Sequence, residues 1–166
     1  MVDNAEVYNG IKKCPDIVHP VLTPNEGPMH IGAKEVAIFR AASDTFPFKN
    51  EIAHKNDTKV RGYVSTVFAC LYEGPIKPLE VKKVVEVLDD MGCYEFSLAD
   101  TIDVGTSGTV SKMLDAIGRG VPPKKRAVHF HDTYSQVLAN VLTFLKYGRF
   151  VRFWFRWLRL CTRSFG

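Results

Sequence analysis

The apolar positions along the chain change their spacing repeatedly between that of strands and that of helices. Short apolar or β-branched runs predict strands at residues 17–22, 35–39, 59–67, 94–98 and 127–131. Longer amphipathic stretches predict helices at residues 77–91, 107–117 and 134–147, after a polar helix near 3–13. Strands that alternate with helices form βαβ units, so this pattern indicates an α/β fold with about five parallel strands and flanking helices.

The three long helices each carry an apolar stripe at helical spacing. The stripes consist of Val81, Val84, Val85 and Leu88; of Val110, Met113, Leu114 and Ile117; and of Val137, Leu138, Val141, Leu142 and Leu145. Between residues 39 and 59 no such stripe occurs, although a parallel connection normally contains a helix.

Polar clusters follow several of the predicted strands. They are TPN (23–25), RAASD (40–44), ADT (99–101) and HDT (131–133). In parallel α/β folds the carboxyl ends of the strands build the functional site, so this placement favours a (β/α)8 barrel or the related doubly wound sheet. No GxGxxG follows the first strand and no GxxxxGK[ST] occurs, which weakens the case for a nucleotide-binding sheet.

Composition bounds the class of protein. The 166 residues are 46% hydrophobic and 24% charged, which is normal for one globular domain and excludes a disordered or low-complexity protein. No run of 18 apolar residues predicts a spanning helix. The four cysteines form no CxxC pair, so we expect reduced thiols rather than a disulfide framework.

The net charge of +4 comes from one end of the chain. Residues 141–166 contain six lysines or arginines and no acid, which leaves 16 basic and 18 acidic residues in 1–140. A nucleic-acid site spreads over a folded face, so no nucleic-acid partner is expected. For residues 149–166 three interpretations stay open: a shifted reading frame or mis-spliced end, a basic amphipathic helix on an anionic membrane surface, and a partner or nucleic-acid contact.

The run HFHD at residues 129–132 carries the sharpest chemical signal. Side chains alternate along a strand, so His129 and His131 are expected on one face, about 6–7 Å apart, where they can chelate one metal ion. The alternative is a pair of hydrogen-bonded polar residues at a strand end. Asp100 and Asp103 follow the preceding strand, where an acid can serve as a base, a metal ligand or the cap of a turn.

Six sequence blocks together resemble the HMGL-like family of metal-dependent carbon–carbon lyases and synthases, and within it the 3-hydroxy-3-methylglutaryl-CoA lyases. The blocks are PVLTPN (20–25), GAKEVAIF (32–39), VRGYVS (60–65), YEG (72–74), MGCYEFSLADTIDVGT (91–106) and AVHFHDTYSQVLAN (127–140). Related synthases share the HxHD strand, whereas the other blocks are more similar to the lyase.

The resemblance implies a (β/α)8 TIM-type barrel that cleaves 3-hydroxy-3-methylglutaryl-CoA to acetoacetate and acetyl-CoA with a divalent magnesium or manganese ion. His129 and His131 match the family's two histidine ligands, and Asp100 matches an acid that the family needs for catalysis. Substrate-binding positions are expected in matching strand-end blocks, at Asn25, Tyr63 and Ser97. An acyl-CoA substrate, a homodimer and a location in the mitochondrial matrix rather than the peroxisome are also implied.

The chain departs from the family pattern at both ends. An arginine–aspartate pair on a first strand and a later Gly-rich cysteine loop have no counterpart, so we expect an incomplete barrel: a partial lyase domain at 1–148 and a basic aromatic tail at 149–166. The loss of metal ligands and of a charge partner predicts little or no lyase activity for this chain by itself. Two alternative functions stay open: a non-catalytic interaction or membrane-surface protein, and a related acyl-transferring synthase.

Overall fold

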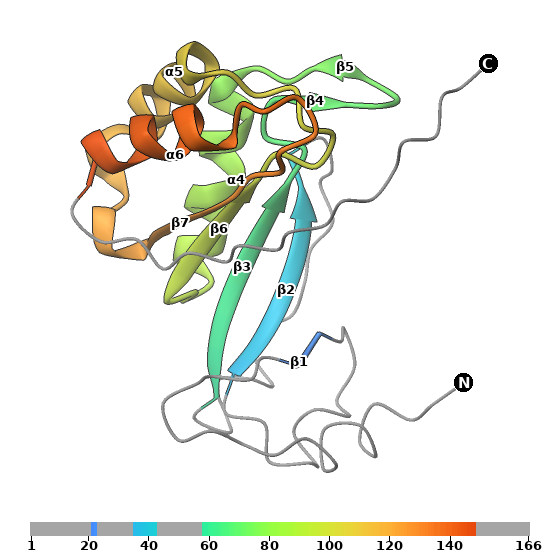
Figure 1. Cartoon of the computed structure of the whole chain (residues 1–166). Helices are drawn as coiled ribbons and strands as arrows, with labels where there is room; N and C mark the ends of the chain where they lie inside the picture. The colour runs from blue at the N-terminus through green and yellow to red at the C-terminus, as the bar shows by residue number, and fades with distance from the viewer. Residues whose placement is uncertain (1–20, 23–34, 43–57, 149–166) are drawn as a thin grey trace, which may run out of the picture.

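The computed structural model describes residues 21–22, 35–42 and 58–148. Their strands form one parallel five-stranded sheet in the order β1-β2-β3-β6-β7 (Figure 1). These strands are β1 (Val21–Leu22), β2 (Glu35–Ala41), β3 (Lys59–Ser65), β6 (Glu95–Ala99) and β7 (Arg126–His129). A separate antiparallel pair consists of β4 (Ala69–Cys70) and β5 (Gly74–Pro75).

Three helices lie on one side of the sheet (Figure 1). They are α4 (Pro78–Asp90), α5 (Ser107–Ile117) and α6 (Val137–Lys146), and the 3-10 turns η1 (Gly118–Gly120) and η2 (Pro123–Lys125) precede β7. The connection from β3 to β6 contains α4, and that from β6 to β7 contains α5. In both cases the connected strands are neighbours in the sheet. The predicted α/β alternation is confirmed, and its order is that of an arc of a (β/α)8 barrel rather than of a doubly wound sheet.

The ends of α4 and α5 follow from the local sequence. Pro78 begins α4, at a position where the missing proline N–H is no loss, and Gly92 follows the helix with φ 81°, which glycine adopts without strain. Thr106 and Thr109 form a capping box at the start of α5. Both helices lie within one residue of their predicted bounds.

The helix α6 begins three residues later than the predicted position 134. Ser135 has a φ of 57°, which a right-handed helix does not allow. Asp132 Oδ1 accepts the N–H of Val137 at 3.2 Å and so satisfies a donor of the first turn. The residues before Val137 therefore form a turn, which the apolar spacing of Tyr134 and Leu138 does not reveal.

The hydrophobic core lies between the helices and the side of the sheet that faces them. All eight apolar residues predicted for α4 and α5 are buried, as expected. The prediction for α6 is wrong in part: Val137 and Val141 are buried, as is Phe144, but Leu138, Leu142 and Leu145 are 66%, 60% and 39% exposed. One side of α6 packs towards α5, and the described residues leave these three leucines exposed.

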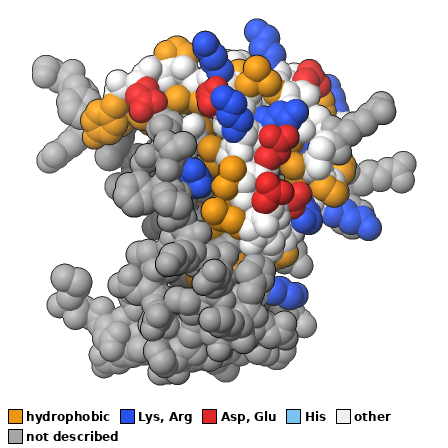
Figure 2. All heavy atoms as spheres, turned by 180° about the vertical axis from the view of Figure 1, so that it is seen from behind, with side chains coloured by type: hydrophobic (Ala, Val, Ile, Leu, Met, Phe, Trp, Pro, Cys, Tyr) orange, Lys and Arg blue, Asp and Glu red, His pale blue; other side chains and the backbone are white. Residues whose placement is uncertain are grey.

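On the surface, Figure 2 shows acidic and basic side chains close together on the described part of the chain. Exposed ion pairs along α4 join Lys82 to Glu86 and Lys83 to Glu80, and such pairs contribute little to stability. Among the described residues, no helix is both long and apolar enough to span a membrane.

Several predictions fall outside the residues that the structure describes. These are the polar helix at 3–13, the start of the strand at 17–22, the substrate residue Asn25, the crossover between 43 and 57, and the tail at 149–166. They stay predictions.

Candidate metal and active site

His129 and His131 meet at the carboxyl edge of the sheet. His129 is the last residue of β7, and His131 lies in the loop that leads to α6. Their Nε2 atoms are 3.0 Å apart and their ring centroids 5.0 Å apart. The predicted strand at 127–131 is therefore wrong at its end. The loop, and not the alternation of a strand, brings the two imidazoles together. Their rings are therefore closer than the spacing of about 6–7 Å expected for residues i and i+2 of one strand.

The geometry of the two imidazoles fits a divalent ion. Adjacent ligands of an octahedral ion, each about 2.1 Å from the metal, lie about 3 Å apart. The separation of the Nε2 atoms matches that spacing, although it also suits one N–H···N hydrogen bond. No group of three or more histidine, cysteine, aspartate or glutamate side chains converges within the described part of the chain. The pair can supply two nitrogen ligands to a divalent ion.

Asp100 directly follows β6 and is only 1% exposed. Its Oδ1 accepts the N–H of Val104 at 3.2 Å, and its Oδ2 accepts the N–H of Gly105 at 2.8 Å. Burial raises the pKa of Asp100 above its ordinary value of 3.8, and these two donors together with the charge of His131 oppose the rise. Asp100 therefore closes its own loop, and it also lies near enough to His131 to interact with it electrostatically.

Tyr63 and Ser97 lie on the sheet face that the helices leave uncovered. Tyr63 on β3 is in register with Ser97 on β6, which is in register with Ala127 on β7. His129 lies two residues beyond Ala127, so Tyr63, Ser97 and His129 project from the same face. Ser97 is buried, and the ring of Tyr63 stacks on Phe39 with 4.7 Å between centroids. The predicted substrate and metal residues of the described strands thus share one face.

Asn140 is a residue near the site that the sequence did not single out. It lies on α6 with no exposed surface, and its Nδ2 donates to the carbonyl oxygen of Gly105 at 2.8 Å. Gly105 itself has no room for a side chain, because a Cβ there would lie 2.5 Å from the ring of Phe68 and 2.6 Å from Asp100 Oδ2. A lone asparagine within an apolar helical stripe is the signal that could have identified Asn140.

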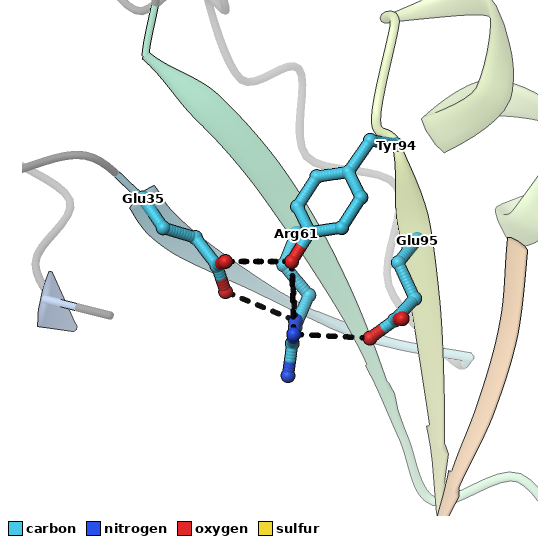
Figure 3. Close-up of polar contacts among 4 residues, drawn as sticks. All are labelled: Glu35, Arg61, Tyr94 and Glu95. Atoms are coloured by element: carbon cyan, nitrogen blue, oxygen red, sulfur yellow. Dashed lines mark hydrogen bonds and ion pairs between the residues drawn. The ribbon is translucent and has the colours of Figure 1, made fainter. Parts of the chain in front are cut away.

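A second polar cluster lies near the amino ends of the strands, away from the histidines, and the sequence did not predict it. Figure 3 shows Arg61 of β3 between Glu35 of β2 and Glu95 of β6. Arg61 Nε lies 3.1 Å from Glu35 Oε1, and Nη2 lies 3.1 Å from Glu95 Oε1. The hydroxyl of Tyr94 accepts from Arg61 Nη2 at 2.8 Å and donates to Glu35 Oε2 at 2.6 Å. Charged residues at the ends of otherwise apolar strands were the available signal.

The amino-end cluster, which consists of Glu35, Arg61, Tyr94 and Glu95, shifts the titration of its own members. Burial and the hydrogen bond to Glu35 raise the pKa of Tyr94. Burial acts to lower the pKa of Arg61, but the hydrogen bond with Tyr94 and the charges of Glu95 and Glu35 outweigh it and raise the pKa. The cluster therefore keeps its guanidinium charged and its phenol neutral.

Comparison with known proteins identifies the family. Residues 29–150 match the HMGL-like family model. The chain belongs to the HMGL-like family. It is 48% identical to the mitochondrial hydroxymethylglutaryl-CoA lyase of Bos taurus, with 89% of this chain and 52% of that protein covered. It is 46% identical to the cytoplasmic 3-hydroxy-3-methylglutaryl-CoA lyase of Mus musculus, with 89% and 49% covered.

A solved structure agrees with this HMGL-like assignment. The crystal structure of hydroxymethylglutaryl-CoA lyase from Pseudomonas aeruginosa superposes with a TM-score of 0.81 at 40% identity, covering 89% of this chain and 56% of that one. The chain thus spans about half the length of the curated relatives named above. The predicted resemblance and the partial barrel fold are confirmed.

HMGL-like lyases depend on a metal in general, which agrees with a convergent histidine pair at the carboxyl edge of the sheet. Of the predicted site residues, the structure brings His129, His131 and Asp100 to that edge and puts Tyr63 and Ser97 on the adjoining face. The roles of these residues stay predictions.

Proposed function

We propose that this chain carries the metal-binding portion of a 3-hydroxy-3-methylglutaryl-CoA lyase site, which cleaves that thioester to acetoacetate and acetyl-CoA. The observation that carries the proposal is the convergence of His129 and His131, with 3.0 Å between their Nε2 atoms, beside the buried Asp100. The relatives reported above are lyases, which supports this reaction over that of an acyl-transferring synthase or a non-catalytic role.

Each residue of the site has a role in this proposal. His129 and His131 hold a magnesium or manganese ion, which when bound polarises the substrate oxygens and lowers the pKa of the C3 hydroxyl. Asp100 lies close to His131, and its carboxylate fixes the loop at its own strand end by accepting two backbone N–H groups. It provides an acid with a raised pKa at the reacting edge. Tyr63 and Ser97 line the face along which the acyl group lies.

The cellular setting belongs to the same proposal. One relative is named as mitochondrial and another as cytoplasmic. We favour the mitochondrial matrix, an acyl-CoA substrate and a homodimer for the protein. Microscopy of a fluorescent fusion tests the compartment: signal confined to the cytosol contradicts it.

Manganese titration of the purified chain by calorimetry tests the histidine pair. We expect His129→Ala and His131→Ala each to weaken binding about tenfold or more, because each removes one of two protein ligands. His54→Ala is the matched control, since His54 belongs to no HxH pattern in the sequence. This variant should bind manganese as the unaltered chain does. Equal binding by all four proteins overturns the metal site.

A chimera tests the reaction. Residues 58–148 of this chain replace the corresponding segment of a full-length HMG-CoA lyase, and acetoacetate release is measured. We expect turnover by the chimera, its loss on His131→Ala in the chimera, and at most a trace from the unaltered chain alone. A folded chimera that binds manganese without releasing acetoacetate contradicts the lyase proposal, and turnover by the chain alone at the rate of the relative contradicts its predicted impairment.

A further inference from the structure

Asp103 connects two loops at the carboxyl edge of the sheet. It lies in the loop between β6 and α5, and its Oδ2 accepts the N–H of Tyr134 at 3.3 Å and the N–H of Thr133. Thr133 and Tyr134 belong to the loop that carries His131 between β7 and α6. One carboxylate therefore joins the loop after β6 to the loop after β7.

Asp103 occupies this place against two local costs. Its φ is 56°, in the left-handed region that favours glycine. It is also 4% exposed, and its Oδ1 has no hydrogen-bond partner within the described structure. A glycine would avoid both costs, so the bonds from Oδ2 to the neighbouring loop are what the aspartate adds. Strained or unsatisfied residues of this kind cluster at active sites and ligand clamps.

Helix capping does not account for the carboxylate. The first turn of α5 is capped by Thr106 together with Thr109. The first turn of α6 receives Asp132 Oδ1 at the N–H of Val137. Neither helix needs Asp103.

His131 needs support from outside its own strand. β7 ends at His129, so no strand pairing holds the backbone at His131. The contacts of Asp103 lie two and three residues further along the same loop, at Thr133 and Tyr134. The helix α6 that follows this loop is bound to the loop after β6 as well, because Asn140 Nδ2 donates to the carbonyl of Gly105.

We propose that Asp103 is a positioning residue, which holds the loop at 131–134 so that His131 Nε2 stays beside His129 Nε2. The inference rests on the proposed metal site and deepens it. Its physical basis is that a metal ligand on a loop must be fixed by hydrogen bonds that do not themselves touch the metal.

Three substitutions separate geometry from charge and from backbone strain. Asp103→Gly accepts the left-handed backbone but removes the acceptor. Asp103→Asn keeps an acceptor oxygen in place without the charge, and Asp103→Glu keeps the charge but moves the oxygens by one methylene. Thr66→Gly is the matched control, because Thr66, which directly follows β3, has a φ of 57° and its backbone N–H donates to Thr101 Oγ1 rather than to the His131 loop.

The first measurement needs no metal: imidazole ¹H–¹⁵N spectra of His129 and His131 in the full chain. We expect Asp103→Gly and Asp103→Glu to shift the His131 resonances, and Asp103→Asn and Thr66→Gly to leave them at the wild-type positions. Calorimetric titration with manganese follows, in which Asp103→Gly should bind about tenfold more weakly and Asp103→Asn about as well as the wild type.

Wild-type His131 spectra for Asp103→Gly overturn the proposal. If Asp103→Gly does not fold, Asp103→Glu and Asp103→Asn decide. Wild-type spectra for Asp103→Glu together with shifted spectra for Asp103→Asn mean that the charge and not the geometry is required, which overturns the proposal. If the wild-type chain binds no manganese, the proposed function fails, while the imidazole spectra still accept or reject the role of Asp103.

Discussion

The polar side chains at the two ends of the sheet have different kinds of bonding partner. At the amino end, Arg61 forms ion pairs of 3.1 Å with Glu35 and with Glu95. At the carboxyl end, the carboxylates of Asp100 and Asp103 accept from backbone N–H groups of the loops instead. The amino end thus uses its charges to hold strands together. At the carboxyl end the backbone of the loops holds the charges in place, and this is the end of the strands where barrels of this type have their functional sites.

The largest expected effect tests the amino end. Arg61→Met should lower the free energy of unfolding by about 3–5 kcal/mol, because it leaves the carboxylates of Glu35 and Glu95 buried without their cation. The side chain of Arg61 is 4% exposed, so solvent cannot replace it. Urea unfolding followed by circular dichroism measures the change.

The matched control makes the same replacement on the surface. Lys83 is paired with Glu80, but its side chain is 68% exposed. Lys83→Met should therefore cost less than about 1 kcal/mol. Equal losses for Lys83→Met and Arg61→Met would mean that burial of the amino-end cluster does not determine its contribution.

A smaller effect tests the backbone arrangement of the carboxyl end. Gly105→Ala should destabilise the fold by about 1–3 kcal/mol, because the added Cβ collides with Phe68 and with the carboxylate of Asp100. Gly120→Ala is the control, since among the described residues, its chain neighbours aside, no atom lies within 4 Å of the Cβ that it would add. Urea midpoints of the two variants should differ; identical midpoints contradict the close packing around Asp100.

The smallest effect is a pH dependence that arises from Asp100. Its pKa in the folded chain is raised above 3.8, chiefly by burial, so the folded state holds the proton more tightly than the unfolded state does. The contribution of Asp100 to stability is therefore most favourable below pH 3.8 and declines as pH rises from 3.8 through the raised pKa.

Urea unfolding across that pH range measures the decline. Asp100→Asn is the comparison: the substitution changes the stability at every pH but should flatten the slope, because an amide does not titrate. Equal slopes for the wild type and Asp100→Asn contradict the raised pKa.

The sequence alone predicted the elements that depend on local information. Each helix carries its signals within its own short segment: an apolar stripe in both, a proline at the start of α4 and the capping threonines at the start of α5. Both helices form where expected. The family blocks likewise indicate His129, His131 and Asp100 as site residues, because residue type and spacing can be read directly from the sequence.

The tertiary structure decided what depends on partners far away along the chain. The separation of Arg61 from Glu35 and Glu95 in the sequence hides their ion pairs, which exist only because β2, β3 and β6 align in one register. The close approach of His131 to His129 likewise depends on the end of β7 and on a loop bound by Asp103, neither of which apolar spacing encodes. Periodicity reports which face of an element is buried, whereas side-chain convergence depends on how the elements are packed together.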